Sequence, residues 1–169
     1  ISDLDYAVND AQSFKDLLVN NFSYDEKNIK LLLNEQATKN NVQSAISDIT
    51  LQAEENDRIV VFFAGHGETM SLPGGGEMGY LLPVDGRQEN LYASAIPMND
   101  LKYLSEMSNA KHMLFLIDAC YGGLAAVGTR GLTPSKTTNY LEKISNIKSR
   151  QIITAGGSDE KVIEKPEWG

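Results

Sequence analysis

Two side chains of this sequence, His66 and Cys120, could act together in nucleophilic catalysis. His66 lies between glycines in the run GHG (65–67), and Cys120 lies in the run DACYGG (118–123). Glycines next to a reactive side chain let the backbone turn sharply and leave that side chain open to a substrate. A free thiol has a pKa of about 8.5, so an imidazole that accepts its proton makes more of the nucleophilic thiolate available. We therefore interpret Cys120 as a nucleophile and His66 as its general base.

A packed cysteine and an unrelated surface histidine are the structural alternative. A structural cysteine behaves as a small apolar residue and normally lies within a buried element. Cys120 instead follows an apolar run, next to two glycines. This position favours catalysis and makes the backbone N–H groups of Gly67 and Cys120 candidates for stabilising an oxyanion.

Alternating helices and strands must position these two residues. We expect helices over 5–20, after an N-cap at Thr38 and from Pro97 onward. We expect strands over 29–33, 58–64, 80–84, 113–117 and 151–155, with loops over 65–79 and 122–134. This order predicts an α/β fold with a mostly parallel sheet, because helices connect parallel strands. Parallel sheets carry their functional sites at the carboxyl ends of their strands. If the strands that end at 64 and 117 are neighbours, His66 and Cys120 come from the same edge of the sheet.

Length, charge and composition exclude several classes of protein. The 169 residues carry a formal charge of −8, which argues against binding a nucleic-acid backbone. One cysteine and two histidines cannot form a disulfide framework or a Cys/His zinc module. The apolar run Ile59–Ala64 is too short to cross a membrane, and no signal peptide is visible. We expect a cytoplasmic protein and regard the chain as a piece truncated at both ends.

The two reactive runs also carry a family resemblance. VVFFAGHGE (60–68) and FLIDACYGG (115–123) resemble the caspase-like cysteine peptidases, and the metacaspase and bacterial branch more than the animal caspases. The position of His66, about 50 residues before Cys120, agrees with that family. Further matches are AVNDA (7–11), NEQAT (34–38), GYLLPVD (79–85) and ITAGGSDE (153–160).

The resemblance implies a fold, a domain and an activity. The fold is a caspase-like three-layer α/β/α sandwich with a mostly parallel central sheet. One catalytic domain would cover residues 1–169, with the large-subunit region to about residue 130 and the start of the small-subunit region after it. The activity is that of an endopeptidase with a His–Cys dyad. We further expect no cofactor, a zymogen or ligand-controlled module, and regulatory flanking domains.

Two carboxylates suggest the substrate preference. Asp118 stands where the animal caspase signature has glutamine, and Asp10 lies in the AVNDA match. In metacaspase-like enzymes the matching acids line the pocket for P1, the residue before the cleaved bond. Two carboxylates would bind a guanidinium or ammonium group through charge-assisted hydrogen bonds, so we expect protein or peptide substrates with Arg or Lys at P1. The alternatives are a solvated Asp10 on an amphipathic helix and an Asp118 that orients the nucleophile loop.

Self-processing and calcium binding are weaker hypotheses. Arg130, in a glycine-rich stretch, is a candidate self-cleavage site or an ordinary surface arginine. Many metacaspases need calcium, and Asp85 matches one of their ligand positions, with Glu68 and Glu77 as further oxygen donors. Calcium takes six to eight oxygens, and the stretch from Cys120 to Glu142 supplies no acid, so we assign no metal ligand.

Two other functions remain open from the sequence. One is a catalytically silent caspase-fold module for signalling or assembly, although such a module needs neither His66 nor Cys120. The other is a doubly wound nucleotide binder, which the missing Gly-rich turn after the first strand disfavours. The run Gly74–Gly76 lacks the Lys-Ser/Thr of a phosphate-binding loop.

Overall fold

The computed structural model describes residues 4–119 and 148–155 of the chain. The α-helices there are α1 (Ala7–Phe22), α2 (Lys39–Gln52), α3 (Leu91–Ser94) and α4 (Met98–Met107). The strands are β1 (Arg58–Ala64), β2 (His66–Ser71), β3 (Glu77–Leu82), β4 (Ile96–Pro97), β5 (His112–Asp118) and β6 (Ser149–Thr154). Short 3-10 turns are η1 (Glu26–Asn28), η2 (Asn34–Gln36) and η3 (Gln88–Asn90). None of the helices in this part of the chain has the length and apolarity that crossing a membrane requires.

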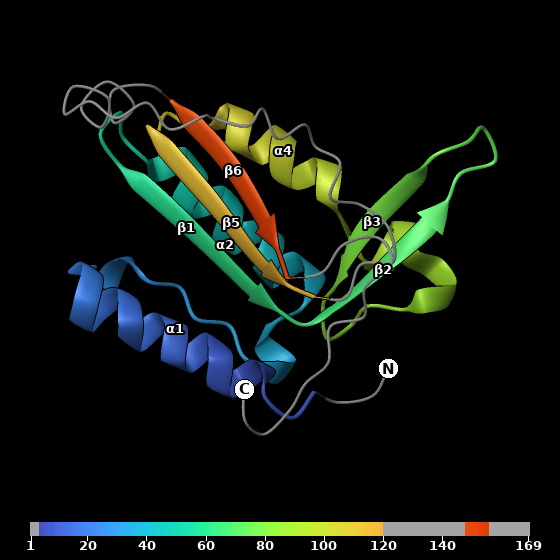
Figure 1. Ribbon diagram of the computed structural model, residues 1–169, viewed down its shortest axis with the longest axis horizontal. Helices are drawn as coiled ribbons and strands as arrows, with labels where there is room; N and C mark the ends of the chain where they lie inside the picture. Colours follow the sequence, from blue (N-terminus) through green and yellow to red (C-terminus); the bar gives the residue numbers. More distant parts are fainter. Residues whose placement is uncertain (1–3, 120–147, 156–169) are drawn as a thin grey trace, which may run out of the picture.

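The main sheet has the order β1-β5-β6, and both of its strand pairs are parallel. The register of β1 and β5 runs from Arg58 opposite His112 to Ala64 opposite Asp118. The two strands that lead toward His66 and Cys120 are therefore neighbours, which is the arrangement that the expected dyad requires. A second, antiparallel sheet, β2-β3-β4, continues from the end of β1 (Figure 1).

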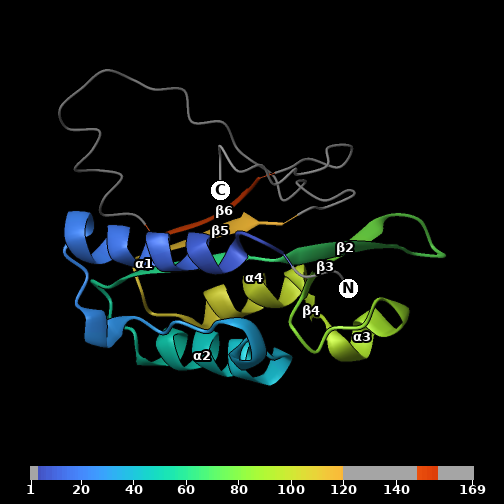
Figure 2. The same cartoon turned by 90° about the horizontal axis from the view of Figure 1, so that it is seen from below.

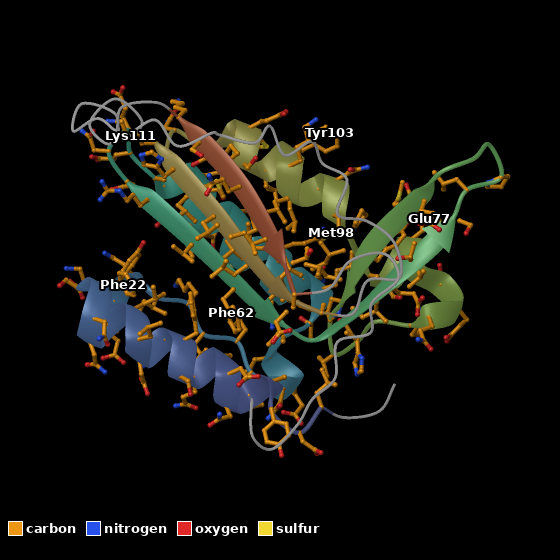
Figure 3. All side chains as sticks on the ribbon, viewed as in Figure 1. Phe22, Phe62, Glu77, Met98, Tyr103 and Lys111 are labelled. Atoms are coloured by element: carbon orange, nitrogen blue, oxygen red, sulfur yellow. The ribbon has the colours of Figure 1, made fainter. Side chains whose placement is uncertain are left out.

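Helices cover the main sheet on both faces, which confirms the expected α/β/α layering. α2 and α4 lie together on one face (Figure 2), and α1 packs against β1 on the other. On the α1 face, the rings of Phe14 and Phe62 stack with centroids 4.6 Å apart. Phe62 is labelled in Figure 3. On the other face, Val61 and Phe63 pack against the main core. Strand β1 has no polar face because successive side chains point to opposite covered faces.

The main core fills the space between the sheet and the helices α2 and α4. Every second residue of β5 contributes to it: Met113, Phe115 and Ile117 are almost completely buried. Ile46 from α2 and Leu101 from α4 meet them from the helical layer. A smaller cluster lies under the second sheet and consists of Tyr80, Leu82, Leu91 and Ala95. This packing fixes the two strand ends that precede the expected dyad.

The predicted loop over residues 65–79 is wrong, because most of it forms the hairpin of β2 and β3. The register runs from His66 opposite Leu82 to Ser71 opposite Glu77. Gly75 and Gly76 form the tip with positive φ angles of 90° and 88°, which a side chain would disfavour. Polar and apolar side chains do not alternate clearly over residues 66–71. This segment forms a strand because its backbone pairs with β3, and a sequence pattern does not reveal that pairing.

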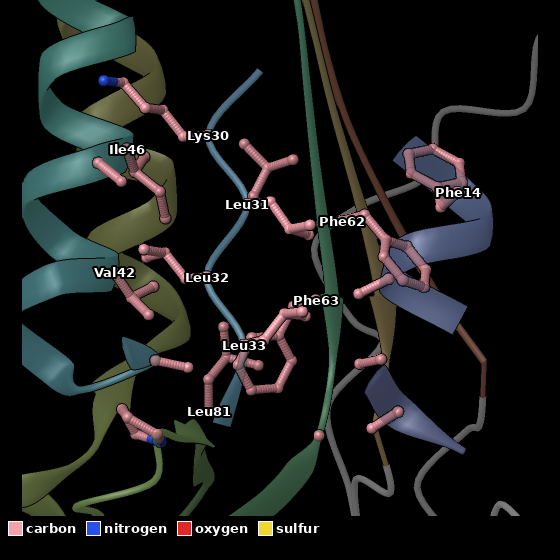
Figure 4. Close-up of a pocket in the computed structure, with 18 of the residues that line it drawn as sticks. Phe14, Lys30, Leu31, Leu32, Leu33, Val42, Ile46, Phe62, Phe63 and Leu81 are labelled. Atoms are coloured by element: carbon pink, nitrogen blue, oxygen red, sulfur yellow. The ribbon is translucent and has the colours of Figure 1, made fainter. Parts of the chain in front are cut away.

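The strand predicted over residues 29–33 is also not observed. These residues run between η1 and η2 without a ladder partner among the described residues. Between them and β1 lies a cavity of about 390 Å³, lined by α1, residues 29–34, α2 and β1. Figure 4 shows Leu31 and Leu33 facing β1 from this segment. The apolar run predicts burial correctly, but a strand also requires a backbone partner.

Candidate active site

The candidate site lies where β1 and β5 end side by side. Ala64 and Asp118 are the last register partners of the two strands. One step further, the backbone N–H of Gly65 donates to the carbonyl oxygen of Asp118 at 3.0 Å. His66 is the next residue, half-buried at the start of β2. The residue before His66 is therefore hydrogen-bonded to the last residue of β5, which fixes the backbone that carries the imidazole.

The packing around position 65 requires a glycine. A Cβ atom at this position would lie 2.8 Å from the Cζ atom of Phe63, closer than carbon atoms tolerate. The Phe63 ring itself packs against the main core, so it has little freedom to move away. The glycine before His66 thus has a steric role in addition to the conformational freedom expected from the sequence.

Cys120 and Arg130 lie outside the described residues, and their roles stay predictions. In the sequence, Cys120 follows Asp118 by two residues, just as His66 follows Ala64. Gly67 lies in β2 opposite Leu81. Its role as an oxyanion donor also stays a prediction.

The two acids expected to bind P1 belong to different layers of the fold. Asp10 lies in the first turn of α1 and is half-buried. Asp118 is the last residue of β5 and is also half-buried. α1 begins on the side of the molecule where β1 and β5 end (Figure 1). The structure therefore places both carboxylates at the end of the sheet that carries His66, which is compatible with a shared pocket.

Asp85, the residue that matches a calcium-ligand position, has a structural partner. One of its carboxylate oxygens accepts a hydrogen bond from the backbone N–H of Lys39, the first residue of α2, at 2.8 Å. The hydroxyl of Thr38 caps the same helix by accepting from the N–H of Asn41. Glu68 and Glu77 lie toward opposite ends of the β2–β3 hairpin. Among the described residues, no three His, Cys, Asp or Glu side chains form a metal-binding group.

Replacing Asp85 with alanine is expected to lower the free energy of unfolding by about 1 kcal/mol, the usual cost of losing an N-terminal cap. Chemical denaturation measures this loss, with Asp48→Ala, an exposed position within α2, as the matched control. If Asp85→Ala instead leaves stability unchanged and raises the calcium concentration needed for activity, the capping role is wrong and the ligand role correct.

The structure adds a polar pair that the sequence analysis missed. The side-chain amide of Gln88, in η3, donates to a carboxylate oxygen of Glu68 at 2.9 Å. Glu68 lies two residues after His66 on β2. Gln88 has no sequence signal, because it is one polar residue in a polar stretch and its contact depends on the path of the chain after β3.

Comparison with known proteins agrees with this α/β domain. A family model described as the caspase domain matches residues 1–165. The chain therefore belongs to the caspase-domain peptidase family.

Its relatives include metacaspases. The chain is 30% identical to Metacaspase-1 of Eremothecium gossypii over 128 residues, which is 70% of this chain and 28% of that protein. It is also 30% identical to Metacaspase-2 of Arabidopsis thaliana over 130 residues, or 69% of this chain and 30% of that protein. The chain thus spans less than a third of the length of these relatives. Among solved structures, protein GSU0716 from Geobacter sulfurreducens matches with a TM-score of 0.47 and 20% identity, over 56% of this chain and 35% of that one.

Proposed function

We propose that this chain is the catalytic domain of a cysteine endopeptidase that cleaves protein or peptide substrates after Arg or Lys. The observation that carries the proposal is the junction of β1 and β5. Their register and the bond from Gly65 to Asp118 bring together the backbones that lead into His66 and Cys120. Membership of the caspase-domain family and about 30% identity to metacaspases support the same activity.

In the proposed chemistry, the two side chains act one after the other. The imidazole of His66 accepts the proton of the Cys120 thiol, and the sulfur attacks the carbonyl carbon of the scissile peptide bond. The protonated imidazole then donates that proton to the departing amine, which leaves a thioester on Cys120. Water hydrolyses the thioester and restores the thiol. The zymogen state, the cytoplasmic location, the control by flanking domains and the self-cleavage after Arg130 also stay predictions.

Hydrolysis of fluorogenic peptides tests this function. The set differs only at P1, with Arg, Lys, Asp or Leu, and is offered to the full-length protein with and without calcium. Cleavage after Arg or Lys that disappears in Cys120→Ala is the expected result. Cleavage after Asp would overturn the acidic pocket but keep the peptidase. No cleavage, together with a Cys120 that does not react with an arginyl electrophile, would favour the catalytically silent module.

Asp118 provides a prediction about specificity. Asp118→Asn removes one charge from the proposed P1 pocket and keeps the shape of the side chain. A hydrogen bond to a charged group contributes about 1.5–3 kcal/mol, so kcat/KM for the Arg peptide should fall roughly 10- to 100-fold relative to the Leu peptide. Asp16→Asn, an exposed acid farther along α1, is the charge-matched control. An unchanged Arg-to-Leu ratio in Asp118→Asn would contradict the role of this carboxylate.

A further inference from the structure

The Glu68–Gln88 pair holds a negative charge close to His66 without neutralising it. One carboxylate oxygen of Glu68 accepts from the amide of Gln88 at 2.9 Å, and the other accepts from the backbone N–H of Thr69 at 3.2 Å. Both donors are uncharged. Within residues 4–119 and 148–155, the ion pairs are Lys15–Glu26 and Lys27–Asp25, so Glu68 has no cationic partner there. Its orientation is fixed, but its charge is still able to act on a neighbouring group.

The strand geometry places that charge on the same face of β2 as His66. Residues two apart in a strand project to one face, and their Cα atoms are about 7 Å apart. Across the hairpin, the register partners on this face are Leu82 for His66 and Tyr80 for Glu68. Tyr80 is completely buried and Leu82 nearly so. The cross-strand neighbours of the two side chains are therefore largely apolar, and a charge acts more strongly beside such neighbours than in water alone.

We propose that Glu68 is a positioning residue that acts through His66. Its carboxylate stabilises the imidazolium that forms when the Cys120 thiol loses its proton, and Gln88 holds the carboxylate in place. This inference rests on the proposed function, because it presupposes the His66–Cys120 dyad. In this role the carboxylate acts through the imidazole and not on the substrate, so its removal should slow the reaction without weakening substrate binding.

Two readouts at one fixed pH test the inference in the full-length protein. The first is the rate at which iodoacetamide alkylates Cys120, and the second is kcat and KM for the Arg peptide. Glu68→Gln keeps the shape of the side chain and removes its charge. We expect the alkylation rate and kcat to fall about tenfold, with KM changed by less than about twofold. Gln88→Ala keeps the charge of Glu68 but removes the hydrogen bond that holds its carboxylate in place. We expect this variant to lower the alkylation rate and kcat by less than Glu68→Gln does.

The matched control is Glu77→Gln, which removes the same charge from the far end of the same hairpin, opposite Ser71. The alkylation rate of Cys120 and kcat for the Arg peptide should equal those of the wild type in this control. An equal loss in Glu77→Gln, or no loss in Glu68→Gln, overturns the inference. A higher KM at unchanged kcat also overturns it, since the carboxylate would then bind substrate. A loss that parallels a lower melting temperature overturns it as well, since Glu68 would then act only on stability.

The alkylation readout separates this inference from the proposed function. If Cys120 is alkylated no faster in the wild type than in His66→Ala, the dyad itself fails and the inference fails with it. If His66→Ala slows alkylation but Glu68→Gln does not, the dyad stands and only the role of Glu68 is rejected.

Discussion

Replacing His66 with alanine is expected to lower kcat for the Arg peptide by about 10²- to 10⁴-fold, the usual contribution of a positioned general base. Without the imidazole, the Cys120 thiol must lose its proton to water, and no group is placed to protonate the departing amine. KM should change little, because His66 is not expected to bind the P1 side chain. Steady-state kinetics on the full-length protein measure both constants.

The second histidine is a natural control for this experiment. His112 begins β5 opposite Arg58, at the other end of the strand from Asp118. His112→Ala should keep kcat within about threefold of the wild-type value, since His112 lies at the far end of β5 from the site and is not placed to transfer a proton there. Equal losses in the two variants would indicate a general effect on folding and contradict the assignment of the base. Combining His66→Ala with Cys120→Ala should add little further loss, because residues that act as a unit are not additive.

Replacing Arg150 with methionine is expected to produce a large loss of stability. The guanidinium group of Arg150, in β6, donates to five backbone carbonyl oxygens at 2.8–3.2 Å. These belong to Ser105, Ser108, Ala110, Lys111 and Ser149, so one side chain serves the end of α4 and the starts of β5 and β6. Lys111, at this end of the sheet, is labelled in Figure 3. A positive charge is also favourable at a helix C-terminus.

Methionine would leave these half-buried carbonyl groups without their donor. We expect the free energy of unfolding to fall by about 2–4 kcal/mol, because bonds to a charged donor contribute more than neutral ones but are not additive. For a domain of this size the melting temperature should fall by roughly 5–15 °C. Arg150→Lys should restore less than half of the loss, because an ammonium group lacks the planar fork of the guanidinium.

Thermal unfolding followed by circular dichroism measures this effect. The matched control is Arg58→Met, which removes an exposed arginine from the first position of β1. It should shift the melting temperature by no more than about 2 °C, as surface substitutions usually do. A similar shift in both variants would mean that the five carbonyl contacts contribute no more than an exposed arginine does.

Local patterns predicted most of the main sheet and its helices. The apolar runs that form β1 and β5 have no polar face, which predicts strands covered on both sides, and both runs form strands of the main sheet. Thr38 caps α2 and Pro97 precedes α4, as their residue types indicate. These features could be predicted because each depends on residues that are close together in the sequence.

The features that were missed depend on contacts between distant parts of the chain. The strand β2 forms because β3 pairs with it, and the polar residues Glu68 and Thr69 give it no apolar alternation. Residues 29–33 have the composition of a strand but no ladder partner among the described residues. Arg150 and Gln88 find their acceptors only after the chain has folded, so their types alone did not distinguish them from surface residues.

The cavity beside β1 has a consequence for handling the protein. In the part of the chain that the structure describes, β1 pairs with β5 on one side only, and its other side borders that cavity. The open side of a strand presents backbone N–H and C=O groups to any extended segment, and apolar surroundings make such pairing stronger. A preparation limited to residues 1–169 should therefore associate with itself as its concentration rises. Concentration-dependent light scattering, rather than loss of catalytic chemistry, would be the first sign of that unpaired edge.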